Sequence, residues 1–316
     1  MTRLGRIARS AGLVLGTGYV LCFFSEAMFW SFWRPDEEPF GRVAQWLLYS
    51  LFGYLTLVVV ALFRLRGGWA LLMAGAFYGW LGEGLVAMTV YGDPSMPFPV
   101  TIAWTALAWH APLSVVVGWY WLGMALRAPR IWPTARLSLV LGLFWGVWGF
   151  GWMAETPPLA AEPFEFLANA LGTTLCLGLA HRAIAAGARA DYRPWWPGVA
   201  VVSSAALAFF ALVTVPAIPF APIVLLPLLA LLGLAMRRRS AAAPDESLLV
   251  DLAAPIRGRN FLALALMPVC ASVVYAAATT ALPPLDAIHL GFAVIAIPVG
   301  TALFGIALAR ALRRRI

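Results

Sequence analysis

Three ionisable side chains stand inside long apolar stretches of this chain. Glu26 follows the stretch AGLVLGTGYVLCFF, Glu83 lies in FYGWLGEGLVAM, and His110 lies in TALAWHAPLSVVV. Carboxylate and imidazole groups bind zinc, iron or manganese, and they also hold and transfer protons. We therefore predict that Glu26, Glu83 and His110 are catalytic, and that the same three side chains bind one divalent metal ion or hold a catalytic proton.

The stretches that position these groups are typical of membrane helices. The 316 residues are 62% hydrophobic and 11% charged, whereas a soluble domain carries about 25% charged residues. This composition predicts an all-α, polytopic membrane bundle with about ten spans. The predicted spans are 10–33, 43–63, 69–90, 100–126, 136–154, 164–186, 197–216, 218–236, 259–280 and 287–309. The seventh and eighth are separated only by residues 216–222, so one broken element is the alternative.

The charged residues predict an orientation. Arginines cluster in alternate connections. The others carry only Arg34 and Arg42 and hold these acidic residues: Asp36, Glu37, Glu38, Asp93, Glu155, Glu162, Glu165 and Asp286. By the positive-inside rule both termini are cytoplasmic, in a multi-pass protein of the plasma or inner membrane. The predicted partners are membrane lipids and a hydrophobic or amphipathic substrate. The net charge of +8 comes from these connections, so we expect no nucleic-acid partner.

The depth and face of the three ionisable groups agree. Glu26 and Glu83 lie about seven residues before the outer ends of their spans, which is roughly 10 Å, and His110 lies roughly 15 Å deep. Each also belongs to a row of small residues spaced four apart, along which membrane helices approach closely. These rows are Gly18, Cys22 and Glu26; Gly75, Gly79, Glu83 and Ala87; and Ala106, His110, Ser114 and Gly118. The site is therefore predicted inside the bundle, open to the extracytoplasmic side. A structural role as interhelical hydrogen-bond partners is the alternative for each.

Several further residues are predicted to line a substrate cavity above the site. They are Trp80, Trp104, Trp109, Trp148, Asn169 and Glu155. The alternative for Asn169 is a helix-to-helix hydrogen bond, and for Glu155 a solvated loop. Trp30, Trp46 and Trp152 instead fit the aromatic belts at the membrane surfaces.

Tryptophan usage predicts two domains. No tryptophan follows Trp196. We therefore expect a six-helix bundle over 1–193, rich in Trp, Gly and Glu, which carries the site. The four-helix part, 194–316, is rich in Ala, Leu and Pro and is expected to be a scaffold, a gate or a dimer surface.

One stretch of the chain resembles a known family. The sequence of residues 97–140 resembles that of the superfamily of CAAX prenyl proteases and bacteriocin-processing membrane proteases. The segment ALAWHAP (106–112) resembles its second motif, and ARLSLVLG (135–142) lies where the third motif is placed.

The same stretch departs from that pattern at the positions that matter most. Ala106 stands where the family has Phe, and Ser138 and Gly142 stand where it has His and Asn. Before this stretch, Glu83 is followed by Gly84, with no second Glu and no Arg after it. Half of the expected ligands are therefore missing, and we assign the chain to no family.

Three functions are compatible with these observations. The first is a membrane-embedded enzyme, in which a metal ion or a protonated Glu drives hydrolase-type chemistry on a lipid-like, isoprenoid or peptide substrate. The second is a secondary transporter coupled to protons or cations, since ten spans with both termini inside suit such carriers. The third is a non-catalytic accessory subunit.

The predicted orientation can be tested with reporter fusions. Fusions after Arg66, Arg136 and Arg239 should report the cytoplasm, and fusions at Glu37 and Glu162 should report the outside. A cytoplasmic signal at Glu162 would invert this orientation and move the predicted site to the other face of the membrane.

Overall fold

The computed structural model describes residues 3–32, 37–94, 96–155, 158–189, 192–240 and 247–313. Arg34, Asp36 and part of the basic tail, on which the orientation partly rests, lie outside these ranges. The described ranges hold helices and no strand, only one isolated bridge between Asp93 and Met96, which confirms the all-α class. The helices are α1 (Arg3–Cys22), η1 (Phe23–Ala27), α2 (Met28–Trp30), α3 (Pro39–Leu62), α4 (Gly68–Leu85), η2 (Thr89–Tyr91), η3 (Val100–Ile102), η4 (Trp104–Trp121), α5 (Leu122–Arg127), α6 (Trp132–Gly151), η5 (Trp152–Ala154), α7 (Pro163–Gly187), α8 (Trp196–Phe209), η6 (Phe210–Thr214), α9 (Val215–Ala217), α10 (Ala221–Ser240), η7 (Leu248–Ala253), α11 (Gly258–Ala263), α12 (Leu266–Ala281) and α13 (Ala287–Arg313).

Nine helical segments of the described chain are long and apolar enough to cross a membrane. They match nine of the ten predicted spans, and the seventh and eighth are separate helices, Trp196–Ala217 and Ala221–Ser240. The protein is therefore a multi-pass helical membrane protein. The remaining predicted span, 69–90, forms the shorter helix α4, which is rich in Gly and aromatic residues and contains Glu83.

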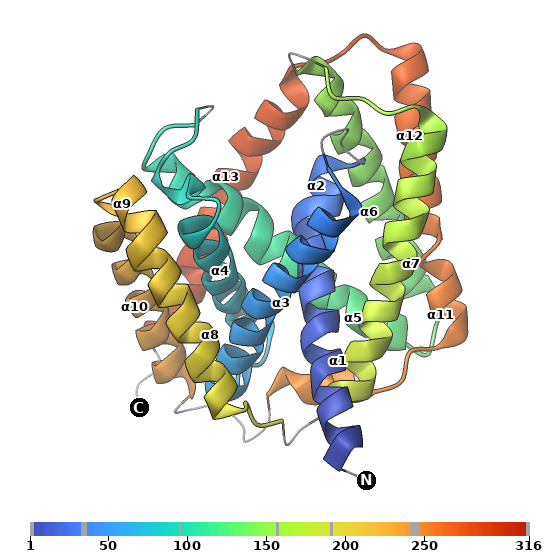
Figure 1. Ribbon diagram of the computed structural model, residues 1–316. Helices are drawn as coiled ribbons and strands as arrows, with labels where there is room; N and C mark the ends of the chain where they lie inside the picture. Colours follow the sequence, from blue (N-terminus) through green and yellow to red (C-terminus); the bar gives the residue numbers. More distant parts are fainter. Residues whose placement is uncertain are drawn as a thin grey trace. The chain divides into compact units, whose positions relative to one another are not determined.

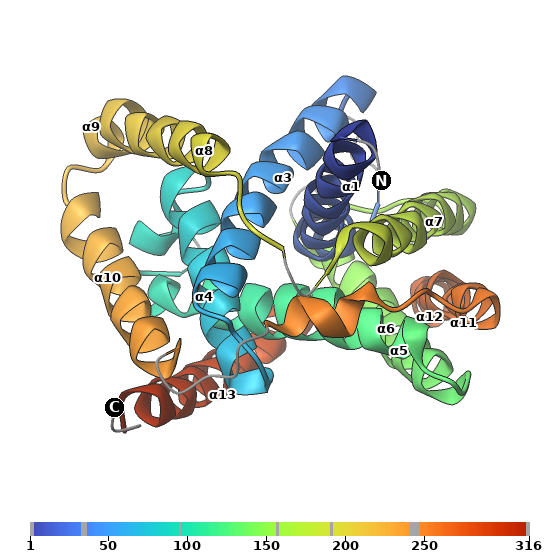
Figure 2. The same cartoon turned by 90° about the horizontal axis from the view of Figure 1, so that it is seen from below.

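Helix α4 nevertheless lies beside α10, and Figure 2 shows both helices from below. The Arg239 guanidinium, at the end of α10, donates to the carbonyl of Arg66, 2.7 Å away and just before α4. Near the other end of α4, the Leu225 side chain packs against Gly84. Because α10 is long enough to span a membrane and the two helices are antiparallel, α4 crosses the same thickness. This packing favours ten crossings.

The chain forms two compact units. Unit 1 comprises Met1–Ser50, Gly118–Gly187 and Leu252–Val294, and unit 2 comprises Leu51–Val117, Ala188–Asp251 and Ile295–Ile316. Each unit takes segments from both sides of residue 193, so the predicted domain boundary does not separate them. The division of roles between 1–193 and 194–316 stays a prediction.

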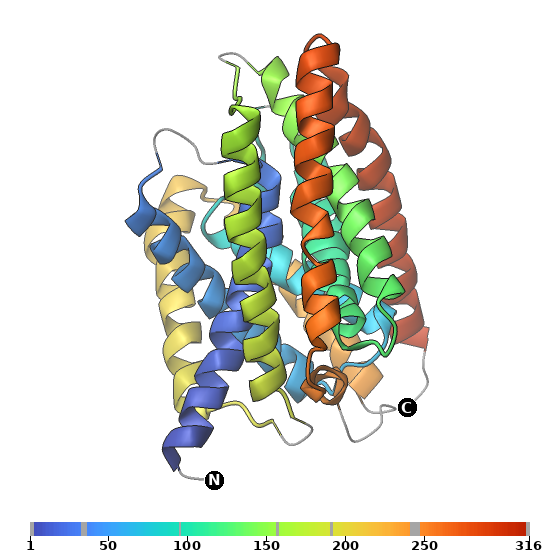
Figure 3. The same ribbon diagram turned by 90° about the vertical axis from the view of Figure 1, so that its right-hand side faces the viewer.

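Unit 1 is built on close helix pairs, α1 with α7 and α6 with α12 (Figure 1). Gly142 and Gly146 of α6 face the backbone of α12, where a Cβ at Gly146 would lie 2.5 Å from the carbonyl oxygen of Ala271. Helices α7 and α12 also lie side by side (Figure 3). Small residues therefore set the contacts of unit 1, as is common between membrane helices.

In unit 2 the predicted small-residue rows of α4 and η4 meet each other. A Cβ on Gly75 would lie 2.5 Å from Cα of Ala111, and a Cβ on Gly79 would lie 2.7 Å from Cα of Ala106. Such distances are too short for any side chain larger than that of glycine. The two backbones are thus in direct contact, and the prediction that these rows mark close approaches is confirmed for this pair of helices.

This contact predicts that Gly79→Leu is strongly destabilising. The added side chain cannot fit between the backbones of α4 and η4, and overpacking costs about 1–3 kcal/mol. We expect a lower midpoint of thermal unfolding in detergent. Gly233→Leu in α10 is the matched control, because a Cβ there meets no atom within 4 Å. Equal midpoints for the two variants would contradict the close contact.

Candidate functional site: a buried carboxylate–imidazole pair

Glu83 and His110 form a direct contact in unit 2. Oε1 of Glu83 lies 2.6 Å from Nε2 of His110, and only 7% of the His110 side chain and 13% of the Glu83 side chain are exposed. Oε2 of Glu83 accepts a hydrogen bond from the hydroxyl of Thr89. Both carboxylate oxygens are therefore engaged within an apolar part of the protein.

The direction of side chains on a helix explains why this pair meets. Side chains lean toward the N-terminus of their own helix. Glu83 therefore leans toward the level of Gly79, and His110 toward the level of Ala106. Because Gly79 and Ala106 are in contact and the helices are antiparallel, the carboxylate and the imidazole converge at that level.

The turn after α4 supplies the hydroxyl that completes the contacts of Glu83. Met88 adopts a left-handed conformation with φ of 60°, which is uncommon for such a residue and turns the chain back toward the helix. The Tyr91 hydroxyl donates to the carbonyl of Gly84, 2.9 Å away. Burial raises the pKa of Tyr91 to about 12, so the phenol stays protonated and keeps donating.

The second nitrogen and the ring of His110 also contact protein groups. Nδ1 of His110 lies 3.4 Å from the Ser114 hydroxyl, and the Tyr78 ring meets the imidazole edge-on at 5.3 Å between centroids. His110 belongs to the π-helical segment η4. Turns of π-helix are rare in proteins, but those that occur are often found at functional sites. Pro112 has no N–H to donate and lies within the same segment.

Glu26 belongs to unit 1, where it has a different set of partners. Its Oε1 accepts a 2.5 Å hydrogen bond from the Tyr49 hydroxyl, and its Oε2 accepts one of 3.1 Å from the Trp30 indole. Like His110, it lies in a π-helical turn, η1. The structure therefore brings Glu83 and His110 together and places Glu26 in the other unit.

The predicted metal ion has no preformed site within the described ranges. No group of three or more His, Cys, Asp and Glu residues is arranged there to hold one. A structural or catalytic zinc site takes at least three protein ligands. The ligand set of Glu26, Glu83 and His110 thus stays a prediction.

The predicted cavity residues are divided between the units: Trp80, Trp104 and Trp109 belong to unit 2, and Trp148, Asn169 and Glu155 to unit 1. Trp80 and Trp109 are 1% exposed, and Trp148 is 2% exposed, so these three rings are packed against protein. The Glu155 side chain is 52% exposed and lies 4.0 Å from Nδ1 of His289.

Unit 1 contains a cavity of about 240 Å³ with charged walls. Glu26, Glu37 and Arg42 line it together with Trp30 and Trp46, two of the rings that were predicted to lie in interfacial belts. Sequence reasoning missed Arg42 as a site residue. The signal was present, because Arg42 is one of two arginines on the predicted outer side, against the positive-inside rule.

The chain matches no family model, and neither the curated proteins nor the solved structures contain a match. Function has to be argued from the site itself.

Two substitutions at Glu83 separate lost charge from lost hydrogen bonding. Glu83→Gln keeps the shape and can still bond to His110 and Thr89, so thermal stability should stay nearly unchanged or rise, because a desolvated charge is removed. Glu83→Leu leaves His110 and Thr89 without their partner and should cost about 1–3 kcal/mol. Thermal unfolding in detergent measures both, and equal stability of the two variants would argue against the hydrogen bonds.

Proposed function

We propose that this protein is a proton-coupled secondary carrier in which the Glu83–His110 pair takes up and releases the coupled proton. The observation that carries the proposal is the 2.6 Å contact between Oε1 of Glu83 and Nε2 of His110 inside the membrane-spanning part. Intramembrane Glu and His side chains form the proton relays of many pumps and transporters.

The net charge of the pair is zero in only one protonation state, and this can couple proton exchange to a conformational change. One proton shared between the carboxylate and the imidazole gives zero net charge, whether it lies on Glu83 or on His110. Gaining a proton makes the pair +1, and losing it makes the pair −1. Both charged states are costly in apolar surroundings. Each is therefore favoured only when the protein opens a path for water, which links protonation to conformation.

The enzyme hypothesis has less support from the same residues. Metal-dependent hydrolysis needs a ligand set, and within the described part of the chain no three suitable side chains are grouped. Acid catalysis needs room for a substrate next to the carboxylate, and Glu83 is instead surrounded by His110 and Thr89. No observation specifically favours the accessory-subunit hypothesis.

Proton flux in reconstituted vesicles tests the proposal. The vesicles carry a trapped pH-sensitive dye, and a panel of organic cations, organic anions and neutral solutes is added outside. At least one class of solute should drive proton movement through the wild-type protein. Glu83→Gln and His110→Ala should each reduce that flux at least tenfold, because neither variant keeps the pair.

Glu162→Gln is the matched control, since it removes a carboxylate from an exposed position and should leave the flux unchanged. Full flux in Glu83→Gln would contradict the proposal. So would the absence of solute-driven flux across the whole panel. A zinc, iron or manganese ion bound to the wild type and lost from Glu83→Gln would favour the metal-dependent enzyme instead.

A further inference from the structure

The cavity of unit 1 is a separate feature, built by α1, η1, α2, α3 and α7. Its walls combine aromatic rings with charge. Tyr19, Phe23, Trp30 and Trp46 supply ring surface, and most of the wall is apolar. Ligand sites in proteins typically have this composition, with apolar walls and a few placed polar groups.

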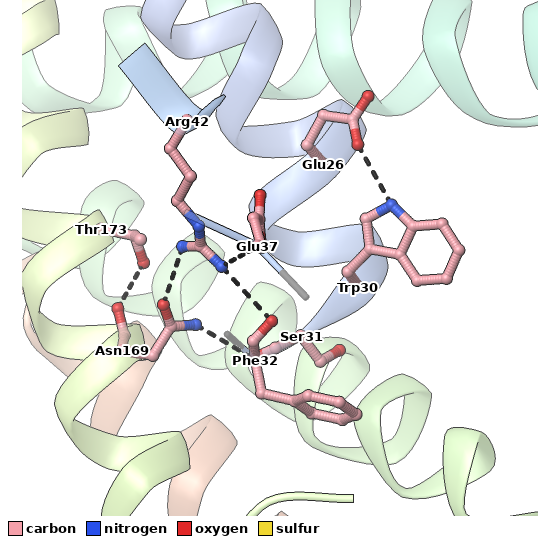
Figure 4. Close-up of polar contacts among 8 residues, drawn as sticks. All are labelled: Glu26, Trp30, Ser31, Phe32, Glu37, Arg42, Asn169 and Thr173. Carbon is pink, nitrogen blue, oxygen red and sulfur yellow. Dashed lines mark hydrogen bonds and ion pairs between the residues drawn. The ribbon is translucent and has the colours of Figure 1, made fainter. Parts of the chain in front are cut away.

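The guanidinium of Arg42 is held by three acceptors of the protein (Figure 4). It donates to Oδ1 of Asn169 at 3.1 Å, to Oε2 of Glu37 at 2.8 Å and to the carbonyl of Phe32 at 3.5 Å. Asn169 in turn donates to the carbonyl of Ser31, 3.2 Å away. Arg42 thus connects α3, α7 and the turn after α2. Its positive charge is paired with the carboxylate of Glu37.

The local backbone explains how these acceptors face Arg42. Ser31 adopts a left-handed conformation with φ of 70°, which ends α2. The carbonyls of Ser31 and Phe32 then point toward Asn169 and Arg42 (Figure 4). The arrangement makes Arg42 a fixed part of the wall.

Glu26 is the second carboxylate of the cavity. The Trp30 indole and the Tyr49 hydroxyl both donate a hydrogen bond to it. Among the described lining residues there are two carboxylates and one guanidinium. Tyr19 and Trp46 meet edge-on at 6.0 Å between ring centroids. Ring faces and carboxylates together attract organic cations.

We propose that this cavity binds a small amphipathic organic cation, such as a quaternary ammonium or a protonated amine with an apolar body. Glu26 faces the charged nitrogen, and Trp30 and Trp46 enclose the apolar part. About 240 Å³ equals the liquid volume of roughly eight water molecules, at ~30 Å³ each. This size suits a single substituted ring. The inference concerns binding alone and stands whether or not Glu83 and His110 carry protons.

Equilibrium binding of radiolabelled phenyltrimethylammonium to the purified full chain in detergent tests this site. The wild type should bind the cation, and unlabelled benzenesulfonate, an anion of similar size, should not displace it. Glu26→Gln should weaken binding at least tenfold, because it keeps the hydrogen-bonding shape and removes the charge. Asp286→Asn is the control, since it removes an exposed carboxylate of the same unit and should leave the affinity unchanged.

A second variant adds bulk at the cavity wall without changing any charge. Gly172 lines the cavity, and a Cβ there meets no atom within 4 Å, so Gly172→Phe places a ring in open space at the wall. It should abolish binding, whereas Gly291→Phe, at a glycine of α13 that also has open space around it, should not. If Glu26→Gln fails to fold, this comparison decides the question.

Three results would overturn the proposal. One is unchanged affinity in a folded Glu26→Gln protein, and another is unchanged affinity in Gly172→Phe. The third is binding of benzenesulfonate without binding of phenyltrimethylammonium, which would identify an anion site centred on Arg42.

Discussion

The high free-energy cost of ionisable groups in apolar surroundings is the constraint on which this structure depends. Glu83 and His110 satisfy it by contacting each other, and that contact requires the backbones of α4 and η4 to touch. Gly75 and Gly79 of α4 make the approach possible, and the turn at Met88 brings the hydroxyl of Thr89 to the remaining carboxylate oxygen. Sequence, packing and site chemistry are therefore linked at one place in unit 2.

Unit 1 meets the same constraint in a different way. Arg42 is surrounded by Glu37, Asn169 and a backbone carbonyl, and Glu26 by an indole and a phenol. Each charge is stabilised by hydrogen bonds, while the rings beside them leave a cavity. A closed pair suits proton exchange, whereas an open cavity with charged walls suits a ligand. The two units thus offer different chemistry from similar residue types.

Much of this arrangement could be predicted from the sequence, because helix length and small-residue spacing are local patterns. The apolar stretches indicated the spans, and the rows through Glu83 and His110 indicated the faces on which their helices approach a neighbour closely. Whether Glu26 lies near Glu83 and His110 could not be predicted from its depth in the membrane and its helix face. Neither of these specifies which helices are neighbours. The role of Thr89 depends on a left-handed turn at Met88, a position where the sequence has no glycine to signal one.

A double-mutant cycle between Glu83 and His110 tests the central claim most directly. The free energy of unfolding is measured for Glu83→Leu, for His110→Ala, for the double variant and for the wild type, under one set of conditions. Side chains in contact show coupling energies of about 0.5–3 kcal/mol, whereas distant ones are additive to within roughly 0.3–0.5 kcal/mol. This account predicts clear coupling. Additive effects of the two substitutions would contradict the contact on which the site and its proposed proton exchange rest.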